Sequence, residues 1–357
     1  MLRVLFAGTP EAAVPALETL AADTEHFEVV AVLTRPDAVR GRGRRLSANP
    51  VKQAARSLDI PVLECDPSEP SFLDELKATG AQAGAIVAYG KILRQPVLDA
   101  LPMGWYNLHF SLLPQWRGAA PVQRAIWSGD SLTGATVFRL TAGMDTGPIL
   151  AQSTLEIGKH DTSGDVLRRL SQEGARLLEA ALQAMADGQI ALQEQPQGAY
   201  EVARKITSKD ARIRFDVPAF AADRQIRACT PDPGAWTMLH LGSDIGTTKG
   251  NGRVHTIAGA KAGAEVPEDS SQASVDAAQM LHVLRAHVVE EPDTTGGSGA
   301  VPQTLEPGKL FVTKKHVWVG TLSAPLELDE VKLQGKKAMP AADWARGAHL
   351  GDGAYLE

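Results

Sequence analysis

The chain has 357 residues, more than one typical domain, and its composition (44% hydrophobic, 22% charged, net charge −6) is ordinary for a globular protein. Its only cysteines are Cys65 and Cys229, with no partner at metal-ligand spacing, which points to a reducing compartment and argues against a disulfide framework or a cysteine-type zinc site. Glu11 and two prolines interrupt the N-terminal apolar run, so neither a signal peptide nor a membrane span is expected. We therefore expect a cytoplasmic protein with no membrane partner.

Short apolar runs alternate with helical patterns in the first half of the chain. The runs RVLFA, EVVAVLT, AGAIVAY and WYNLHF predict buried strands over 3–7, 28–34, 83–89 and 105–110. Helical spacing predicts helices over 11–22, 49–59 and 71–79. This alternation predicts an α/β domain with a doubly wound, mostly parallel sheet, in which ligands bind beyond the carboxyl ends of the strands.

Two further strands and a long helix complete this domain. The strands are expected over 134–141 and 148–157, on either side of the loop AGMDTG. In the helix that follows, Thr162 and Asp165 have the spacing of a capping box and Gly188 marks the end. The first domain is therefore expected to cover residues 1–189.

The pattern changes after residue 189. Residues 190–209 are polar without strong periodicity, which predicts a linker, and short β-like runs then predict a small β-barrel of OB-like type over 210–357. The expected strands are 235–241, 253–259, 309–313, 316–321 and 325–333. Residues 262–304 hold acidic clusters and a TGGSG run, which favour an inserted, partly disordered segment that is dispensable for chemistry. Within it, VDAAQMLHVLRAHVV (275–289) has the spacing of a short amphipathic helix.

Three polar side chains are candidates for chemistry. Asn107 and His109 lie two apart at the end of a predicted strand, so both point to the same face, and Leu113-Pro114 stiffens the turn that follows. Glycines in GMDTG place Asp145 on a tight loop at the sheet's edge. Asn107 is a neutral donor, His109 is an acid/base that can gain or lose a proton near neutral pH, and Asp145 is an anion. Such a set suits acyl transfer, in which an oxyanion is held while protons move. The same set suits other reactions, and spacing alone does not choose among them.

One segment concentrates positive charge. From Arg35 to Arg56 there are seven basic residues against one acid, Asp37, which indicates a surface for an anion. GRGRRL begins like a dinucleotide-binding fingerprint, but Leu46 stands where glycine is needed and no strand immediately precedes it. From residue types alone, a solvated basic loop is the simplest interpretation.

Taken together, the motifs resemble the folate-dependent formyltransferases. The segments that carry the resemblance are FAGTPE (6–11), NLHFSLLPQWRGAAPVQRAIWSGD (107–130) and LTAGMDTGPIL (140–150). TRPDAVRGRGRRLSANPVK (34–52) is similar to a basic loop that distinguishes members acting on tRNA from those acting on small amines, and ARKITSKDARIRFD (203–216) resembles the entry to their C-terminal domain. The likeness covers most of residues 1–260 and resumes near GKKAMPAADW; residues 262–304 depart from it.

The resemblance implies a Rossmann-like catalytic domain and roles for the site residues. Asn107 and His109 would hold the oxygen of the formyl group of 10-formyltetrahydrofolate while an amine attacks. Asp145 would orient His109, favour its cationic form and take part in removing the amine proton. The bond between Leu113 and Pro114 would be cis. The residues implied to bind folate are Ser111, Leu112, Leu113, Pro114, Lys91, Ile92 and Leu93.

The implied acceptor is the amino group of initiator methionyl-tRNA, so that the product would serve translation initiation. The residues implied to contact the tRNA are Arg42, Arg44, Arg45, Lys205 and Lys209. Folate would be a co-substrate, no metal is implied, and we expect a monomer. Three alternatives remain: a formyltransferase acting on a nucleotide-sugar amine, a formyltetrahydrofolate deformylase in which water replaces the amine, and an RNA-binding protein without catalytic activity.

Overall fold

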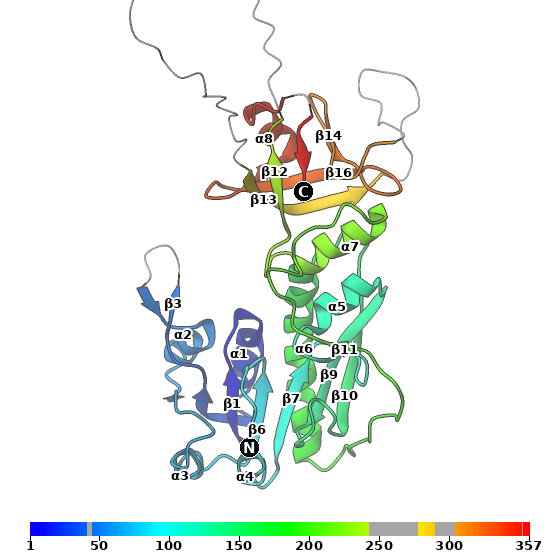
Figure 1. Ribbon diagram of the computed structural model, residues 1–357. Helices are drawn as coiled ribbons and strands as arrows, with labels where there is room; N and C mark the ends of the chain where they lie inside the picture. The colour runs from blue at the N-terminus through cyan, green and yellow to red at the C-terminus, as the bar shows by residue number, and fades with distance from the viewer. Residues whose placement is uncertain (41–44, 243–277, 290–303, 352) are drawn as a thin grey trace, which may run out of the picture. The chain divides into compact units, whose positions relative to one another are not determined.

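A computed structural model describes residues 1–40, 45–242, 278–289, 304–351 and 353–357 (Figure 1). These residues form two compact units, each taken by itself below. The first unit contains residues 1–211 and 224–234, and the second contains residues 212–223 and 235–357. Within the described part of the chain, no helix has the length and apolar character needed to cross a membrane.

The first unit is built on a seven-stranded sheet with the order β10-β9-β7-β6-β1-β2-β5. Its strands are β1 (Leu2–Gly8), β2 (Phe27–Leu33), β5 (Val62–Leu63), β6 (Ala83–Val87), β7 (Trp105–His109), β9 (Leu132–Arg139) and β10 (Ile149–Glu156). All neighbours from β7 to β5 pair in parallel, whereas β9 and β10 are antiparallel. The chain runs outward from β1 to β2 and β5, then returns to β6 on the other side of β1. This reversal confirms the predicted doubly wound sheet and marks the place where such sheets bind ligands.

Helices cover both faces of this sheet, which explains the continuous apolar runs. The helical elements are η1 (Glu11–Ala13), α1 (Val14–Ala22), α2 (Pro50–Ser57), α3 (Phe72–Ala78), α4 (Gln95–Leu98), α5 (Pro121–Ser128) and α6 (Ser163–Ala186). Along β1, Val4 and Phe6 pack into the core formed with α1, α2, α5 and α6, while Leu5 and Ala7 pack into the core formed with α3 and α4. Because neither face meets water, a strand with alternating polar residues would leave buried groups without partners.

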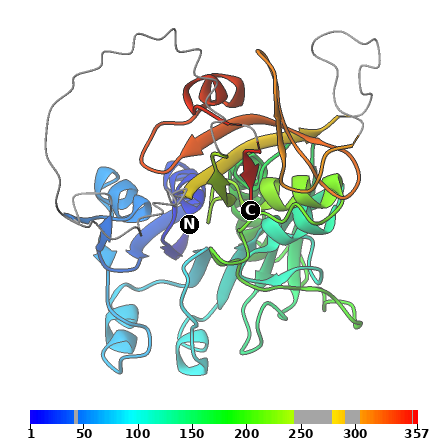
Figure 2. The same ribbon diagram turned by 45° about the horizontal axis from the view of Figure 1, so that its top comes forward.

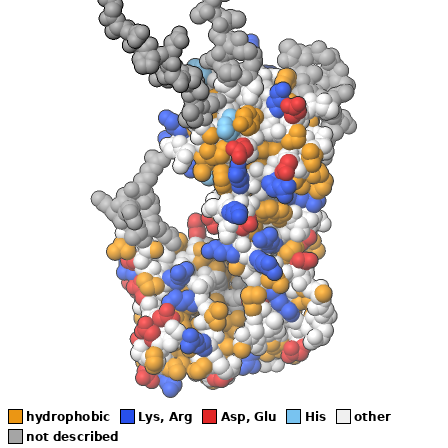
Figure 3. Space-filling view, in the orientation of Figure 1, with side chains coloured by type: hydrophobic (Ala, Val, Ile, Leu, Met, Phe, Trp, Pro, Cys, Tyr) orange, Lys and Arg blue, Asp and Glu red, His pale blue; other side chains and the backbone are white. Residues whose placement is uncertain are grey.

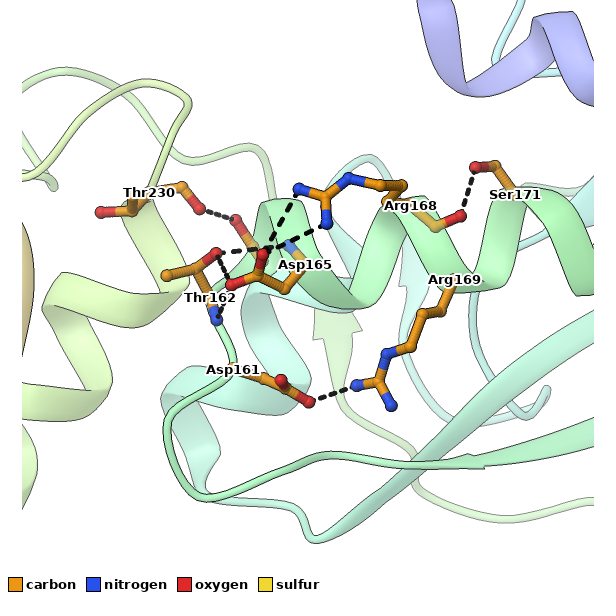
Figure 4. Close-up of polar contacts among 8 residues, drawn as sticks. Asp161, Thr162, Asp165, Arg168, Arg169, Ser171 and Thr230 are labelled. Carbon is orange, nitrogen blue, oxygen red and sulfur yellow. Dashed lines mark hydrogen bonds and ion pairs between the residues drawn. The ribbon is translucent and has the colours of Figure 1, made fainter.

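The capping box predicted for α6 is confirmed. The Thr162 hydroxyl accepts a hydrogen bond from the Asp165 N–H, and the Asp165 carboxylate accepts one from the Thr162 N–H (Figure 4). The Ser163 hydroxyl donates to the Thr230 carbonyl at 2.7 Å. The two bonds between Thr162 and Asp165 satisfy backbone donors that the start of a helix leaves without intrahelical partners.

Residues 190–209 are hydrogen-bonded along the first unit. Gln193 forms a bridge with Ile149, and β11 (Val202–Ala203) pairs in parallel with β8 (Arg117–Gly118). Further on, the chain forms α7 (Ala219–Cys229). The stretch predicted as a linker therefore contributes a two-stranded ladder to the first unit.

The second unit is an antiparallel sheet with the order β14-β15-β16-β13-β12-β18, and β17 pairs with β16. Its elements are β12 (Trp236–His240), β13 (Gln279–Val288), β14 (Leu310–Val312), β15 (Val317–Val319), β16 (Leu326–Leu333), β17 (Met339–Pro340), α8 (Ala341–Gly347) and β18 (Tyr355–Leu356). A bridge between Lys309 and Tyr355 brings the two edges of the sheet together. The sheet is thus a nearly closed barrel, which confirms the predicted β-barrel class.

The helix predicted over residues 275–289 is wrong where the structure describes it. Residues 279–288 form β13, which pairs with β12 on one side and lies along β16 on the other (Figures 1 and 2). Leu281 and Val283 are buried with strand spacing, and an irregularity in the register then brings Ala286 inward. This mixture of spacings resembles a helical period. The strand predicted over 253–259, and residues 262–277 and 290–303 of the predicted insertion, lie outside the described residues.

Candidate active site

A pocket of about 590 Å³ opens at the carboxyl ends of β6 and β7 in the first unit. Its lining includes Asn107, His109 and Asp145, which the structure therefore brings together from β7 and from the loop between β9 and β10. Lys91, Ile92 and Leu93 line the same pocket from the loop after β6. The volume lies within the range of sites for small ligands.

The β-sheet register sets the positions of the two β7 side chains. Asn107 lies between Ile86 of β6 and Phe138 of β9, and His109 lies opposite Thr136 of β9. His109 is only 6% exposed, and its ring stands edge-on to the Phe138 ring at a centroid distance of 6.4 Å. The Asn107 amide makes no hydrogen bond to another described residue, so its donors are available to a ligand in the pocket.

His109 is oriented by a backbone carbonyl. Its Nε2 lies 2.9 Å from the carbonyl oxygen of Trp116. Because a carbonyl only accepts, Nε2 carries the proton and Nδ1 is the nitrogen left for chemistry. Nδ1 lies 3.9 Å from Oδ2 of Asp145, within range of electrostatic attraction but beyond a hydrogen bond.

Asp145 is held by the segment that follows β7. Its Oδ2 accepts a hydrogen bond of 2.8 Å from the Gly118 N–H, and its backbone has a φ of 52°, in the left-handed region. Trp116 also has a positive φ, and its indole N–H donates to Asp130 at 2.7 Å. Residues 116–118 therefore contact both His109 and Asp145.

The turn at residues 111–114 supports the site from behind. None of these four residues is among those that line the pocket. Ser111 donates to the Gln115 carbonyl, and Thr136 links the turn to β9 by donating to the Ser111 carbonyl and accepting from the Leu113 N–H. The Leu113-Pro114 bond is cis, as expected. In this structure the turn fixes the end of β7.

Side chains at the pocket mouth combine charge with apolar surface. Lys91 Nζ forms an ion pair of 2.8 Å with Asp66, and this bond keeps the pKa of Asp66 well below its ordinary value. Ile92 is 88% exposed and Met144 is 61% exposed, although both belong to the pocket lining. Burial raises the pKa of Tyr89, whose hydroxyl has no hydrogen-bond partner among the described residues. The lining thus offers a ligand an apolar surface that also carries a few polar groups.

The basic segment is a hairpin with a buried anchor at its base. Strands β3 (Ala38–Arg40) and β4 (Arg45–Ser47) pair in antiparallel fashion. Nearby, Lys52 is 5% exposed and its Nζ lies 2.7 Å from carboxylate oxygens of both Asp37 and Glu64, which raise its pKa. Arg42 and Arg44 lie outside the described residues.

Other predicted contacts lie away from this pocket. Lys205 and Lys209 are exposed, and neither lines it. In Figure 3, Lys and Arg side chains of the first unit are scattered among acidic and apolar ones. Among the described residues, one group has side chains of the types that ligate metals close together: His287, Glu327 and Asp329 of the second unit, whose nearest such atoms lie within 4.8 Å of one another. Nδ1 of His287 already lies at hydrogen-bond distance, 3.0 Å, from the Asp329 carboxylate, so a cross-strand hydrogen bond accounts for this group.

Comparisons with known protein families match these features. A family model described as formyl transferase matches residues 2–182, and one described as formyl transferase, C-terminal domain, matches residues 205–349. The chain belongs to the formyl transferase family.

Among its relatives are proteins named methionyl-tRNA formyltransferase. The one from Bifidobacterium adolescentis is 64% identical over 357 residues, with 100% of both chains covered. The one from Thermobifida fusca is 45% identical, covering 99% of this chain and 98% of its own.

Solved structures share the fold at lower identity. An N-formyltransferase from Helicobacter canadensis, in complex with folinic acid and dTDP-3-aminofucose, has a TM-score of 0.59 and 15% identity, covering 92% of this chain and 99% of its own. HypX from Aquifex aeolicus, in complex with tetrahydrofolic acid, has a TM-score of 0.58 and 12% identity, covering 98% of this chain and 47% of its own.

Two contacts of the site were not assigned from the sequence. The carbonyl of Trp116 orients His109, and a buried glutamine, Gln195, bonds to the backbone of the Asp145 loop. Every residue has a backbone carbonyl, so residue types do not show that the one of Trp116 accepts a hydrogen bond from His109. Gln195 stands in the polar run QEQPQG, where nothing separates it from its exposed neighbours.

Proposed function

We propose that this chain transfers the formyl group of 10-formyltetrahydrofolate to the amino group of initiator methionyl-tRNA, giving formylmethionyl-tRNA for translation initiation. The observation that carries the proposal is the 64% identity, over the full length of both chains, with the methionyl-tRNA formyltransferase of Bifidobacterium adolescentis. The pocket with Asn107, His109 and Asp145 supplies groups suited to this chemistry.

In the proposed reaction the methionyl amine attacks the formyl carbon, and the carbonyl oxygen becomes an oxyanion. The Asn107 amide donates a hydrogen bond to this oxygen, as in other oxyanion sites. His109 keeps its Nε2 proton on the Trp116 carbonyl, so a second proton on Nδ1 makes it a cation, which the Asp145 carboxylate stabilises.

The intermediate then collapses. The bond between the amine nitrogen and the formyl carbon is already in place from the attack, so the oxyanion re-forms the carbonyl as the bond from that carbon to N10 of the folate breaks. His109 and Asp145 share the transfer of the amine proton, and N10 leaves with the electron pair and takes up a proton. The products are the formylated amine and tetrahydrofolate.

The folate co-substrate is assigned to the pocket lining at Lys91, Ile92 and Leu93. The exposed side chain of Ile92 offers apolar area to flat rings, and Lys91 offers positive charge to an anionic tail. Ser111, Leu112, Leu113 and Pro114 act by holding the end of β7 next to this surface. No metal takes part in the proposed reaction.

We assign residues 1–189 to catalysis, 190–209 to a linker and 210–357 to tRNA binding. The two family models, which match residues 2–182 and 205–349, support this division. The residues proposed to contact tRNA are Arg42, Arg44, Arg45, Lys205 and Lys209, and the enzyme is proposed to act as a monomer. The likeness to a sugar N-formyltransferase, at 15% identity, supports a common fold and does not favour an amino sugar as acceptor.

An acceptor assay tests the proposal. Purified protein is incubated with 10-formyltetrahydrofolate and one of three acceptors: charged initiator tRNA, an amino-sugar nucleotide, or none. We expect rapid formylation of the charged tRNA, no product with the sugar, and little folate deformylation without acceptor. Faster formylation of the sugar, or equal folate turnover without acceptor, would overturn the assignment.

A further inference from the structure

Gln195 is a buried polar residue in an exposed polar stretch. Its residue exposure is 7%, whereas Glu194 and Pro196 on either side are exposed. Burial of an amide is unfavourable unless its hydrogen bonds are made. Its contacts therefore indicate what the side chain does.

Both the oxygen and the nitrogen of the Gln195 side-chain amide are hydrogen-bonded. Its Oε1 accepts two hydrogen bonds from the Arg117 guanidinium, at 3.1 Å from Nε and 2.6 Å from Nη2. Its Nε2 donates to the carbonyl oxygens of Asp145, at 2.8 Å, and Gly147, at 2.7 Å. Because a guanidinium only donates and a carbonyl only accepts, only this orientation of the amide satisfies all four bonds.

Asp145 is held through both its backbone and its carboxylate. Gln195 holds the backbone of Asp145, and the N–H of Gly118, next to Arg117, holds its carboxylate at 2.8 Å. The φ of 52° at Asp145 is a conformation that a residue with a side chain keeps only where the surroundings hold it. Gln195 supplies two of the bonds that do so.

We infer that Gln195 is a positioning residue for the reaction. It fixes the loop that carries Asp145, and so sets the 3.9 Å distance between the Asp145 carboxylate and Nδ1 of His109. This inference rests on the proposed function, because the chemistry that it serves is formyl transfer. It goes beyond that proposal by giving residue 195, in the linker, a part in catalysis.

The test is Gln195→Glu, with Gln193→Glu as its matched control. The first variant retains the size of the side chain and the contact with Arg117, but turns an oxygen toward the two carbonyls in place of the NH₂ donor. The second makes the same change two residues away, at an exposed side chain. Misplacement of a catalytic group by about 1 Å costs roughly a hundredfold in rate.

We expect Gln195→Glu to lower kcat by about ten- to a hundredfold while the KM values for folate and charged tRNA change by less than about threefold. Gln193→Glu should match the wild type. A wild-type kcat for Gln195→Glu, or equal losses in both variants, would overturn the inference. Because a loss of folded protein also lowers the apparent kcat at unchanged KM, the rates are divided by the concentration of folded protein, and a merely structural role would then leave kcat at the wild-type value.

A second readout does not depend on the reaction. Hydrogen–deuterium exchange in a peptide covering residues 143–150 should be faster in Gln195→Glu than in the wild type, and unchanged in Gln193→Glu. Unchanged exchange in both variants would overturn the inference whether or not the wild type formylates tRNA. Failure of the wild type to formylate tRNA would separately reject the proposed function. If Gln195→Glu does not fold, Arg117→Met replaces it, because this change releases the Oε1 end of the Gln195 amide. The same peptide should again exchange faster than in the wild type. Normal exchange in Arg117→Met would also overturn the inference.

Discussion

His109 donates a hydrogen bond of 2.9 Å from Nε2 to the carbonyl oxygen of Trp116. This single bond decides which nitrogen of the imidazole is free, and it places the free Nδ1 on the side of Asp145. Trp116 is itself fixed, because its N–H donates to the Glu201 carbonyl and its indole donates to Asp130. Backbone geometry therefore fixes the tautomer of the neutral His109 ring before a substrate binds.

The first prediction concerns the oxyanion site. Asn107→Ala and His109→Ala should each lower kcat by about a hundred- to a thousandfold, the usual cost of one oxyanion donor. The double variant should lose less than the product of the two factors, because the residues act as a unit in the same step. His109→Ala should also lower stability by about 1–3 kcal/mol, since it leaves the Trp116 carbonyl without its partner. Steady-state kinetics and thermal melts test this, and a single variant with near wild-type turnover would refute the site assignment.

The second prediction concerns the basic hairpin. Arg42→Ala should lower kcat/KM for charged tRNA while formyl-folate binding stays normal. Neutralising Arg44 or Arg45 should each reduce the slope of log affinity against log salt by about 0.7–0.9, the value for one phosphate contact. Arg56, exposed on α2, is the matched control. If the Arg44 and Arg45 variants keep the wild-type slope and Arg42→Ala keeps wild-type kinetics, the hairpin is only a solvated loop.

The third prediction concerns pH. The ion pair with Lys91 and bonds from Ser68 lower the pKa of Asp66 from its ordinary 3.8, so Asp66 stabilises the fold above that pH and this contribution is lost as pH falls through the folded-state pKa. Asp66→Asn should therefore melt below the wild type at pH 7, and the difference should narrow below about pH 4. Asp74→Asn, at an exposed position on α3, is the control. A difference that is independent of pH would mean that the ionised pair is not its cause.

The fourth prediction concerns the start of α6. Removing the hydroxyl in Thr162→Ala should cost about 1 kcal/mol, the typical value for an N-cap. For a domain of this size that corresponds to a fall in Tm of about 2–4 °C. Thr162→Ser retains the hydroxyl that accepts from the Asp165 N–H and should melt above Thr162→Ala. Equal melting of the two variants would show that the cap contributes little.

The fifth prediction revises the expectation that residues 262–304 are dispensable. That range contains β13, whose Leu281 and Val283 are fully buried and which pairs with both β12 and β16. Deleting 262–304 should therefore prevent the second unit from folding. Replacing only 290–303 by a Gly-Ser link keeps every described strand and should leave the unit folded. Limited proteolysis compares the two chains, and a folded second unit in the larger deletion would contradict the prediction.

Patterns that depend on neighbours in the sequence were predicted well. The buried strands of the first sheet show as apolar runs because both faces are covered, and the capping box of α6 depends on two residues three apart. Asn107 and His109 share a pocket because a strand places alternate side chains on one face.

What could not be predicted depends on contacts between distant parts of the chain. The burial of Gln195 follows from Arg117 and the Asp145 loop, which are 78 and 50 residues away. The strand β13 was missed because its register irregularity disguises the two-residue period, and only its partners β12 and β16 decide its conformation.

The ladder between β8 and β11 has a consequence for how the protein is made. Gly118, which binds the Asp145 carboxylate, is paired with Ala203, 85 positions later in the chain. A nascent chain that has emerged from the ribosome only through α6 already contains Asn107, His109 and Asp145, but lacks both Gln195 and the strand that fixes residues 117 and 118. At a synthesis rate of about 5–20 residues per second, the polypeptide spends roughly one to a few seconds in that state. During this interval the growing chain carries Asn107, His109 and Asp145 without the contacts that align them, so under the proposed function catalytic competence is expected only after Ala203 has been synthesised.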